Sequence, residues 1–408
     1  MKKPFFLAKS SKNDRKLIKK KTFIYKAKIN QETRKNFNRS LDLCHQLYNH
    51  CLEQRIMAWK RSRTSLSYCD QANELPTLKK EFPEFKTIGS QTIQSVLIKI
   101  DQSFQSFYKY HKSFKTKKSK PRKDGQLHGF PRFKSTYRYN SLTLTSQAGW
   151  SLNGRDLKIN KIGSFRLYLS RPIEGEIKTI TIKRRSNGSI YVSFICINVP
   201  TKELPKTNKS IGLDMGLTHY ITDSDGRHID NPCYFKNSQK KLANRQRKLA
   251  LKEFRSKNWV KNKILIDKSY EKIVNQKKDF LHKLSNFYIK NYQIICIEDL
   301  DIKSMIENDF SKSIADASWG RFFYYLGYKA EDAGRLRIKV NPKGTSQRCC
   351  RCGRLVPKDL SVRIHDCPYC GLRLHRDINS AINVLGLGTS LAGLPFNIEE
   401  TISRISLL

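Results

Sequence analysis

The spacing of apolar residues changes along the chain, and each change predicts a different kind of element. Residues 21–30 alternate apolar and polar side chains, which is typical of a β-strand. From residue 31 to about residue 111 the apolar positions recur every three or four residues, so we expect a subdomain of amphipathic helices. Residues 128–200 return to period two, with Asn-Gly turns between the runs, and predict a mostly β region. We expect the strand near Phe23 to complete a small barrel there.

The second half of the chain alternates strands and helices. Two or three short strands are predicted directly after residue 210. Residues 236–290 have a helical period and many Lys and Arg residues, so we expect a helical hairpin with one face on the core and one on phosphate. Residues 292–300 contain an uninterrupted apolar run, as a central strand does. A helix over 319–333 and a strand over 335–340 follow. This order of strands and helices is similar to that of RNase H-like domains.

The charge balance indicates a polyanionic partner. The 408 residues include 79 Lys and Arg against 35 Asp and Glu, which gives a formal net charge of +44. A charge of this size repels the compact state unless a polyanion shares the field. The sequence has no continuous apolar run of ~20 residues and no signal-peptide pattern. We therefore expect a cytoplasmic protein that binds nucleic acid rather than a membrane, along a groove instead of a local patch.

Two cysteine pairs have the spacing of a structural zinc site. The chain has 11 cysteines, an odd number that favours a reduced, intracellular protein over a disulfide scaffold. Four of them form two Cys-x2-Cys-Gly knuckles: Cys349, Cys352, Cys367 and Cys370. Four thiolates are typical of closed tetrahedral Zn²⁺ sites, and the glycine permits the tight turn. Cys350 is the surplus thiol, and we expect His365 and His375 to be ordinary surface histidines.

Three carboxylates stand at the ends of apolar segments. Asp214 follows the apolar start of a strand, Glu298 ends the buried strand, and Asp377 opens a helix. Acids at such positions can point into one cleft while their backbones stay rigid. Each also has a structural interpretation: Asp214 as a turn cap, Asp377 as a helix N-cap, and Asp299 in the place of Glu298.

A trio of acids in a basic protein favours metal-dependent phosphodiester hydrolysis. Two divalent ions ~4 Å apart activate water and stabilise the leaving oxygen. Mg²⁺ prefers a few carboxylates together with water and substrate phosphate, and crowded acids repel one another until a cation binds. We expect two catalytic Mg²⁺ at the acids. The zinc knuckles precede Asp377 closely and would hold it in register with the other two.

Several motifs in order resemble the TnpB family, the RNA-guided nucleases of bacterial insertion sequences. Within residues 211–388 they are IGLDMGL, IICIEDL, SKSIADASWGRFFYYLGYKAEDAGR, GTSQRCCRCG, CPYCG and HRDINSAINV. The N-terminal half matches more loosely, through YNHCLEQR and GFPRFKS.

The resemblance implies a multidomain α+β fold. A wedge-type β-barrel with an inserted helical recognition domain is followed by an RNase H-like (RuvC) α/β nuclease domain with an inserted zinc ribbon. The corresponding segments are a basic arm and first barrel strand (1–30), the helical domain (31–115), the barrel (116–205), the first nuclease part (206–342), the ribbon (343–372), the last nuclease helix (373–388) and a tail without an assigned role (389–408).

The resemblance also implies a function. Asp214, Glu298 and Asp377 match the RuvC metal ligands of the family. A transposon-derived RNA serves as scaffold and guide, DNA is opened beside a short flanking motif, and one active site cuts both strands of the duplex. We expect a monomer with its RNA. Candidates for reading the flanking motif are Tyr68, Ser90, Gln91 and Gln94, although a polar stripe on that helix is also typical of solvated surface.

Three other functions are consistent with parts of this sequence. A compact type V CRISPR effector shares the nuclease domain and differs in its genetic neighbourhood. A non-cleaving, RNA-guided regulator also binds nucleic acid, but such relatives lose one or more of the acids, and this chain has all three. A transposase would need strand joining, and the sequence shows no tyrosine or serine recombinase constellation.

Overall fold

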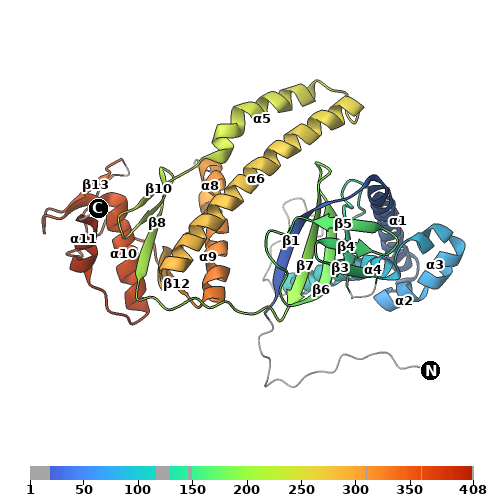
Figure 1. Ribbon diagram of the computed structural model, residues 1–408, viewed down its shortest axis with the longest axis horizontal. Coiled ribbons are helices and arrows are strands. Elements are labelled where there is room, and N and C mark those ends of the chain that lie inside the picture. Colours follow the sequence, from blue (N-terminus) through green and yellow to red (C-terminus); the bar gives the residue numbers. More distant parts are fainter. Residues whose placement is uncertain (1–18, 116–128, 146–148, 308–310, 360, 407–408) are drawn as a thin grey trace, which may run out of the picture. The chain divides into compact units, whose positions relative to one another are not determined.

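The computed structural model divides the chain into two compact units, Met1–Pro200 and Thr201–Leu408 (Figure 1). The residues that it describes are 19–115, 129–145, 149–307, 311–359 and 361–406. Within these ranges, no helix combines the length and apolar character needed to cross a membrane.

The first unit contains a seven-stranded antiparallel sheet in the order β2-β6-β7-β1-β5-β4-β3. Its strands are β1 (Lys21–Lys28), β2 (Ser141–Leu144), β3 (Trp150–Asn153), β4 (Asp156–Ile159), β5 (Gly163–Leu167), β6 (Glu176–Arg184) and β7 (Ile190–Ile197). β1 pairs with β7 and β5, with Phe23 opposite Phe194 and Ala27 opposite Leu167, so the N-terminal strand completes the sheet as predicted. The edge strands β2 and β3 do not pair with each other in the described residues. The predicted barrel is therefore a half-barrel in the described residues.

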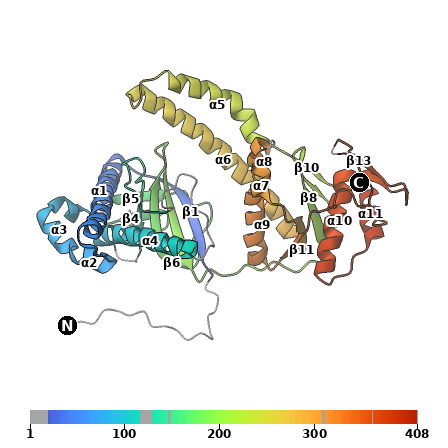
Figure 2. The same cartoon turned by 180° about the vertical axis from the view of Figure 1, so that it is seen from behind.

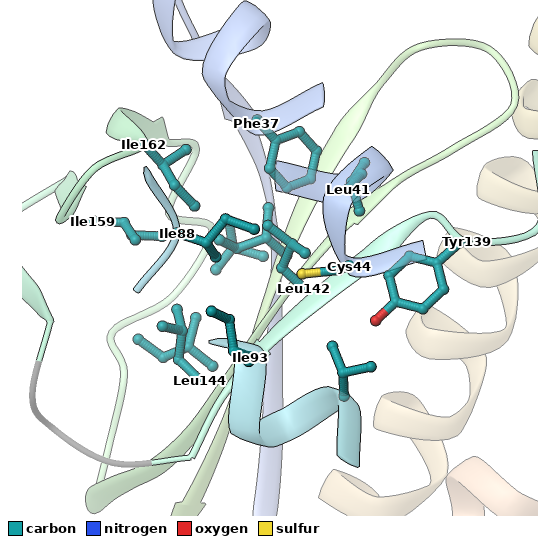
Figure 3. Packing of buried hydrophobic residues seen from close by; sticks show 14 of the residues in the cluster. Phe37, Leu41, Cys44, Ile88, Ile93, Tyr139, Leu142, Leu144, Ile159 and Ile162 are labelled. Carbon is teal, nitrogen blue, oxygen red and sulfur yellow. The ribbon is translucent and has the colours of Figure 1, made fainter. Parts of the chain in front are cut away.

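The helices of the first unit lie between β1 and β2 in the sequence. They are α1 (Gln31–Ser62), α2 (Tyr68–Asn73), α3 (Leu75–Glu81), the 3₁₀ turn η1 (Pro83–Thr87) and α4 (Ser90–Lys115). Asn30 caps α1 by accepting a hydrogen bond from the backbone N–H of Thr33 at 2.8 Å. Figure 3 shows Leu41 and Cys44 of α1 gathered with Ile93 of α4 near Leu142 of β2. Helices and sheet therefore share one hydrophobic core.

The second unit is built on a five-stranded mixed sheet in the order β10-β9-β8-β11-β12. Its strands are β8 (Ser210–Met215), β9 (His219–Asp223), β10 (His228–Asp230), β11 (Ile294–Glu298) and β12 (Leu336–Val340). β11 pairs in parallel with β8 on one side and with β12 on the other. The apolar run therefore forms a central strand, as its sequence predicted.

Helices cover both faces of this sheet. They are α5 (Tyr234–Ala250), α6 (Lys257–Asn291), α7 (Ile302–Ile306), α8 (Ser311–Ala317), α9 (Trp319–Ala333), α10 (Arg376–Leu391) and α11 (Ile398–Ser406). The predicted basic hairpin is formed by α5 and α6 (Figure 2). Ile295 and Ile297 share a core with α6 and α9, whereas Cys296 packs with Val384 and Leu385 of α10. Because strand side chains alternate between faces, α10 lies on the face opposite α6 and α9.

Two glycines bring α10 very close to the sheet. A Cβ atom on Gly212 of β8 would lie 2.1 Å from the carbonyl oxygen of Ala381, and one on Gly388 of α10 would lie 2.2 Å from the Sγ of Cys296. Both distances are far below van der Waals contact, so only glycine fits at either position. The side chains at the start of α10 are thereby held against the ends of β8 and β11.

The C-terminal segment is part of the packed structure. α10 continues to Leu391, and α11 contributes the buried Ile402 to a small core that also contains Cys349, Cys367 and Ile382. Arg351 and Glu399 form a two-pronged ion pair, with nitrogen–oxygen distances of 3.0 and 3.1 Å. The segment 389–408, to which the sequence assigned no role, therefore contains a helix that packs on the cysteine knuckles.

Candidate active site and metal centre

Strand register places Asp214 and Glu298 on the same face of the sheet. Leu213 of β8 lies opposite Ile297 of β11, so the next residue on each strand is an acid. Gly212 and Cys296, two positions earlier on these strands, both meet α10. Since side chains two residues apart point to the same face, both carboxylates point toward α10.

Asp377 reaches this face from the first turn of α10. Ser380, one turn further along, donates a hydrogen bond from its hydroxyl to Oδ1 of Asp214 at 3.0 Å. The residue that caps the helix is His375, whose side chain accepts from the backbone N–H of Asp377. The alternative interpretation of Asp377 as the N-cap is thus wrong, and its carboxylate is left to face the other acids.

Glu298 is buried and fixed by a hydroxyl. It is 6% exposed, and Oγ1 of Thr345 donates to its Oε1 at 2.8 Å. The neighbouring Asp299 has a 59% exposed side chain and pairs with the ammonium group of Lys339 at 2.6 Å. Asp299 therefore does not substitute for Glu298 in this cluster.

The electrostatics of Asp214 show that the three acids interact. Burial raises the pKa of Asp214 well above its usual value, and the negative charges of Glu298 and Asp377 raise it further. The hydrogen bond from Ser380 and the nearby Arg376 act in the opposite direction. Burial also raises the pKa of Glu298, against the hydrogen bond from Thr345. Without a cation the cluster resists full ionisation, which is the electrostatic condition that favours metal binding.

Arg376 compensates part of this negative charge. Its Nε lies 3.3 Å from Oδ1 of Asp377, and both side chains are mostly buried, at 13% and 15% exposure. No local sequence pattern singled out Arg376, Ser380 or Thr345. Ser380 could have been found from its spacing. It lies three residues after Asp377, and residues three apart lie on the same face of a helix.

The donor set suits a hard divalent cation, but the three acids do not form one tight cage. Within the described residues, the cysteine group is the only set of three or more His, Cys, Asp or Glu residues whose ligand atoms all lie within 4.8 Å of one another. Carboxylate oxygens are the ligands that Mg²⁺ prefers, so the residues present are of the kind that hold such an ion.

The four predicted zinc ligands do form such a cage. Their Sγ atoms all lie within 4.8 Å of one another. Cys349 and Cys370 are 3.6 Å apart, as are Cys352 and Cys367. Tetrahedral Zn²⁺ with bonds of ~2.3 Å requires sulfur–sulfur distances of ~3.8 Å, whereas a disulfide requires ~2 Å. The thiols therefore have the spacing of a zinc site.

The two knuckles repeat one backbone geometry. The N–H of Gly353 donates to the carbonyl of Cys349 at 2.9 Å, and Gly371 donates to Cys367 at the same distance. The φ angles of the glycines are +73° and +70°, as the sequence predicted. Burial raises the pKa of Cys350 to about 12, so this surplus thiol stays protonated outside the cage.

Two asparagines of α10 connect the cysteine knuckles to the acid cluster. Asn379 accepts from the N–H of Cys350 at 2.9 Å and donates to the carbonyl of Arg348 at 2.8 Å. Asn383 donates to the carbonyls of Arg348 and Thr345 at 2.7 and 2.8 Å. Since Thr345 holds Glu298, one chain of hydrogen bonds extends from the first knuckle to the buried acid.

The two histidines near the knuckles are not ordinary surface residues. His365 is fully buried and contacts Lys358, which corrects the sequence-based prediction. His375 is partly buried, and its ring lies 4.8 Å from that of His228, which in turn lies 4.6 Å from that of His219. This histidine cluster supports the first turn of α10, and nothing in the local sequence pattern indicated it.

The candidates for reading the DNA motif lie on helices of the first unit. Tyr68 begins α2 and packs partly against the core, while Ser90, Gln91 and Gln94 occupy the first turns of α4. Ser90 and Gln94 are exposed, and Ser90 accepts a hydrogen bond from Lys79 at 3.0 Å. Their role in reading DNA stays a prediction.

Comparison with known proteins gives matches over most of the chain. Residues 194–309 match the family OrfB_IS605, described as "Probable transposase", and residues 319–384 match the family described as "Cas12f1-like, TNB domain". A "Putative RNA-guided DNA endonuclease" of Streptomyces pristinaespiralis is 29% identical over 92% of this chain and 91% of its own length.

Two further relatives have similar identities. InsQ of Escherichia coli, which carries the same description, is 29% identical over 64% of this chain and 68% of its own length. The TnpB-like protein L79 of Acanthamoeba polyphaga mimivirus is 27% identical over 55% of this chain and 46% of its own length. The consecutive family matches and the nearly full-length relative thus support the predicted membership of the TnpB family.

Proposed function

We propose that this protein is a transposon-encoded, RNA-guided DNA endonuclease whose catalytic residues are Asp214, Glu298 and Asp377. The observation that carries this proposal is the convergence of three carboxylates on one face of the second sheet, from segments about 80 residues apart in the chain. Structural acids rarely gather in this way, because each raises the cost of ionising the others.

The relatives support the same activity and its substrates. The bacterial proteins from Streptomyces pristinaespiralis and Escherichia coli are both described as RNA-guided DNA endonucleases. The net charge of +44 suits a protein that binds a guide RNA and a DNA duplex at the same time. In this division of labour, base pairing with the guide reads the target sequence, and the protein contacts the backbone and a short flanking motif.

We assign the acid cluster to two Mg²⁺ ions and the cysteine cluster to one Zn²⁺. When bound, Mg²⁺ activates the attacking water and stabilises the leaving oxygen of the phosphodiester. Thr345 and Ser380 orient the oxygens of Glu298 and Asp214 through hydrogen bonds. Arg376 lowers the repulsion between the acids and can contact a substrate phosphate beside them. The zinc site has four thiols and no open position, which suits a structural role.

The second unit then corresponds to an RNase H-like (RuvC) nuclease domain with an inserted zinc ribbon. In its mixed sheet, β11 is an interior strand with an acid at its C-terminal end. The cysteine knuckles lie between β12 and α10 in the sequence, so the ribbon interrupts the domain just before its last acid. The first unit corresponds to the wedge and recognition domains.

Two adjacent acids, the last residue of β11 and the residue that follows it, provide a matched test. Glu298→Gln removes a buried member of the cluster, whereas Asp299→Asn removes an exposed acid one residue away. With guide RNA, a matched duplex and Mg²⁺, we expect the Glu298→Gln protein to cut at least ~100-fold more slowly than wild type, since even outer-shell changes at metal sites cost 10–100-fold. The Asp299→Asn protein should cut within a few-fold of wild type.

RNA binding separates a catalytic loss from misfolding. Both variants should bind the guide RNA as tightly as wild type in a filter-binding assay. A wild-type protein that binds RNA and matched DNA but never cuts, whichever divalent metal and flanking motif are supplied, would instead be a regulator. Equal losses of cutting rate in the two variants would contradict the assignment of Glu298 to the active site.

A further inference from the structure

A cleft of about 620 Å³ in the first unit has an unusual charge balance. It is bounded by α1, α4 and the segment 129–138, and its lining includes Lys99, Arg132, Lys134 and Arg138. No Asp or Glu of the described ranges lines it. Its volume is within the range of pockets that hold small ligands.

Two of these lysines are partly withdrawn from water without an acidic partner. Neither Lys99 nor Lys134 forms an ion pair with any described residue. Burial lowers the pKa of Lys99 to about 8; the thiol of Cys44 acts in the opposite direction, and the smaller effect of Lys134 lowers the pKa again. Burial also lowers the pKa of Lys134. Two cations held in this way favour an anion from outside the chain.

Aromatic rings and hydrogen bonds hold these lysines in place. The ammonium group of Lys134 lies 4.0 Å from the centre of the Tyr48 ring, and that of Lys99 lies 5.8 Å from the centre of the Tyr139 ring. Asn49 accepts from the N–H of Lys134 and donates to its carbonyl, both at 2.9 Å. A position fixed at both backbone groups is a built site and not the chance location of a surface lysine.

The sequence next to the cleft wall has a net positive charge. The segment 116–128, which joins α4 to the cleft wall in the sequence, has five Lys or Arg residues and one Asp. Arg132 and Arg138 also line the cleft and add positive charge. Cationic side chains without neighbouring carboxylates are groups that bind phosphate oxygens.

We propose that this cleft binds a backbone phosphate of nucleic acid through Lys99 and Lys134. This rests on the proposed function and extends it to a specific contact in the first unit. A phosphodiester of the guide RNA and one of the target DNA present the same oxygens. Binding measurements with each nucleic acid distinguish the two sources.

The first experiment compares two double variants of the full-length chain that lose the same charge. Lys99→Met with Lys134→Met neutralises the cleft, whereas Lys26→Met with Lys158→Met neutralises two exposed lysines on strands β1 and β4. Affinities for a single-stranded RNA and for a DNA duplex of about 20 units each are measured over a range of salt concentrations without Mg²⁺. Each lost phosphate contact lowers the salt slope by ~0.7 for single strands and ~0.9 for duplex DNA.

We expect the salt slope of the cleft variant to show the loss of at least one phosphate contact with RNA or with DNA. The control variant should lose fewer contacts. Equal slopes for the two double variants with both nucleic acids would overturn the assignment. Misfolding is checked by thermal unfolding of the nucleic-acid-free protein. The cleft variant should unfold at no lower temperature than wild type, because methionine removes a partly desolvated charge.

A second experiment locates the contact by chemical protection. Lysines of the full-length protein are acetylated and quantified by mass spectrometry, in the free state, with RNA and with DNA. Lys99 and Lys134 should become several-fold less reactive with one of the two nucleic acids, which identifies the source of the phosphate. Unchanged reactivity with both at saturation would reject the site. If the protein cuts matched DNA but both experiments give the negative result, only the phosphate-binding cleft is rejected. If both experiments give the expected result but the protein never cuts DNA, the proposed nuclease activity is rejected.

Discussion

The two candidate metal sites of the second unit differ in how completely the fold assembles them. The four cysteine sulfurs lie within 4.8 Å of one another, whereas the three carboxylates interact electrostatically without forming so tight a group. Neutral thiols can approach each other at little cost before a metal arrives. Carboxylates cannot, because like charges at short range raise each other's pKa.

The difference also follows from where the ligands come from. The cysteines belong to two short turns only 14 residues apart in the chain, and each turn closes by local hydrogen bonds. The acids come from β8, β11 and α10, which meet only when the sheet has formed. One site is therefore a local structure that supports the fold, and the other depends on the whole fold for its geometry.

The largest expected effect is the loss of the zinc site. In Cys352→Ser, the ribbon loses a ligand of a site whose metal-binding free energy is on the order of 10 kcal/mol. We expect zinc content to fall from about one ion per chain to a small fraction, as measured by atomic absorption. Cutting should fall at least ~10-fold, because Asn379 and Asn383 transmit the ribbon's position to the acids.

Cys350→Ala is the matched control for this change. It removes the adjacent thiol, which is buried and outside the cage, so zinc content should stay at the wild-type level. Loss of zinc from the control would mean that the ligand set is wrong.

A smaller effect of opposite sign is expected at the acids. Asp214→Asn removes an ionisable group whose folded-state pKa is raised by burial and by two neighbouring acids. A raised carboxyl pKa stabilises the fold below the unfolded pKa, and this contribution is lost as the pH rises through the folded value. The metal-free variant should therefore be more stable than wild type at neutral pH. Thermal unfolding in a chelator measures the difference.

Mg²⁺ should distinguish the same two proteins. In wild type, the rise in unfolding temperature on adding Mg²⁺ should grow with pH, because ionised acids bind the metal and protonated ones do not. The Asp214→Asn protein should show a smaller and flatter response. A wild-type response that shrinks with increasing pH would contradict the assignment of the acids as ligands.

The smallest expected effect lies on the surface of the ribbon. Arg351→Met breaks the ion pair with Glu399, whose side chain is 62% exposed. Exposed pairs contribute ~0–1 kcal/mol, so the unfolding temperature should fall only slightly and zinc content should not change. A large loss of zinc would show that α11 holds the knuckles through this pair and not through the buried Ile402.

The sequence indicated those features that local patterns encode. The apolar run before Glu298 predicted a central strand, and the glycine after each cysteine pair predicted a turn with positive φ. The half-barrel, the burial of His365 and the packing of α11 depend on contacts between distant segments, which no local period records. Thr345 was missed for the same reason, since its partner Glu298 lies 47 residues earlier in the chain.

The glycines between α10 and the sheet restrict how this protein can be engineered for heat resistance. Replacing a helical glycine with alanine usually stabilises a protein, by ~1 kcal/mol. At Gly388 the added methyl group would overlap the sulfur of Cys296, and at Gly212 it would overlap the helix backbone. A thermostabilisation library that treats these two positions as routine targets would therefore be enriched in inactive clones.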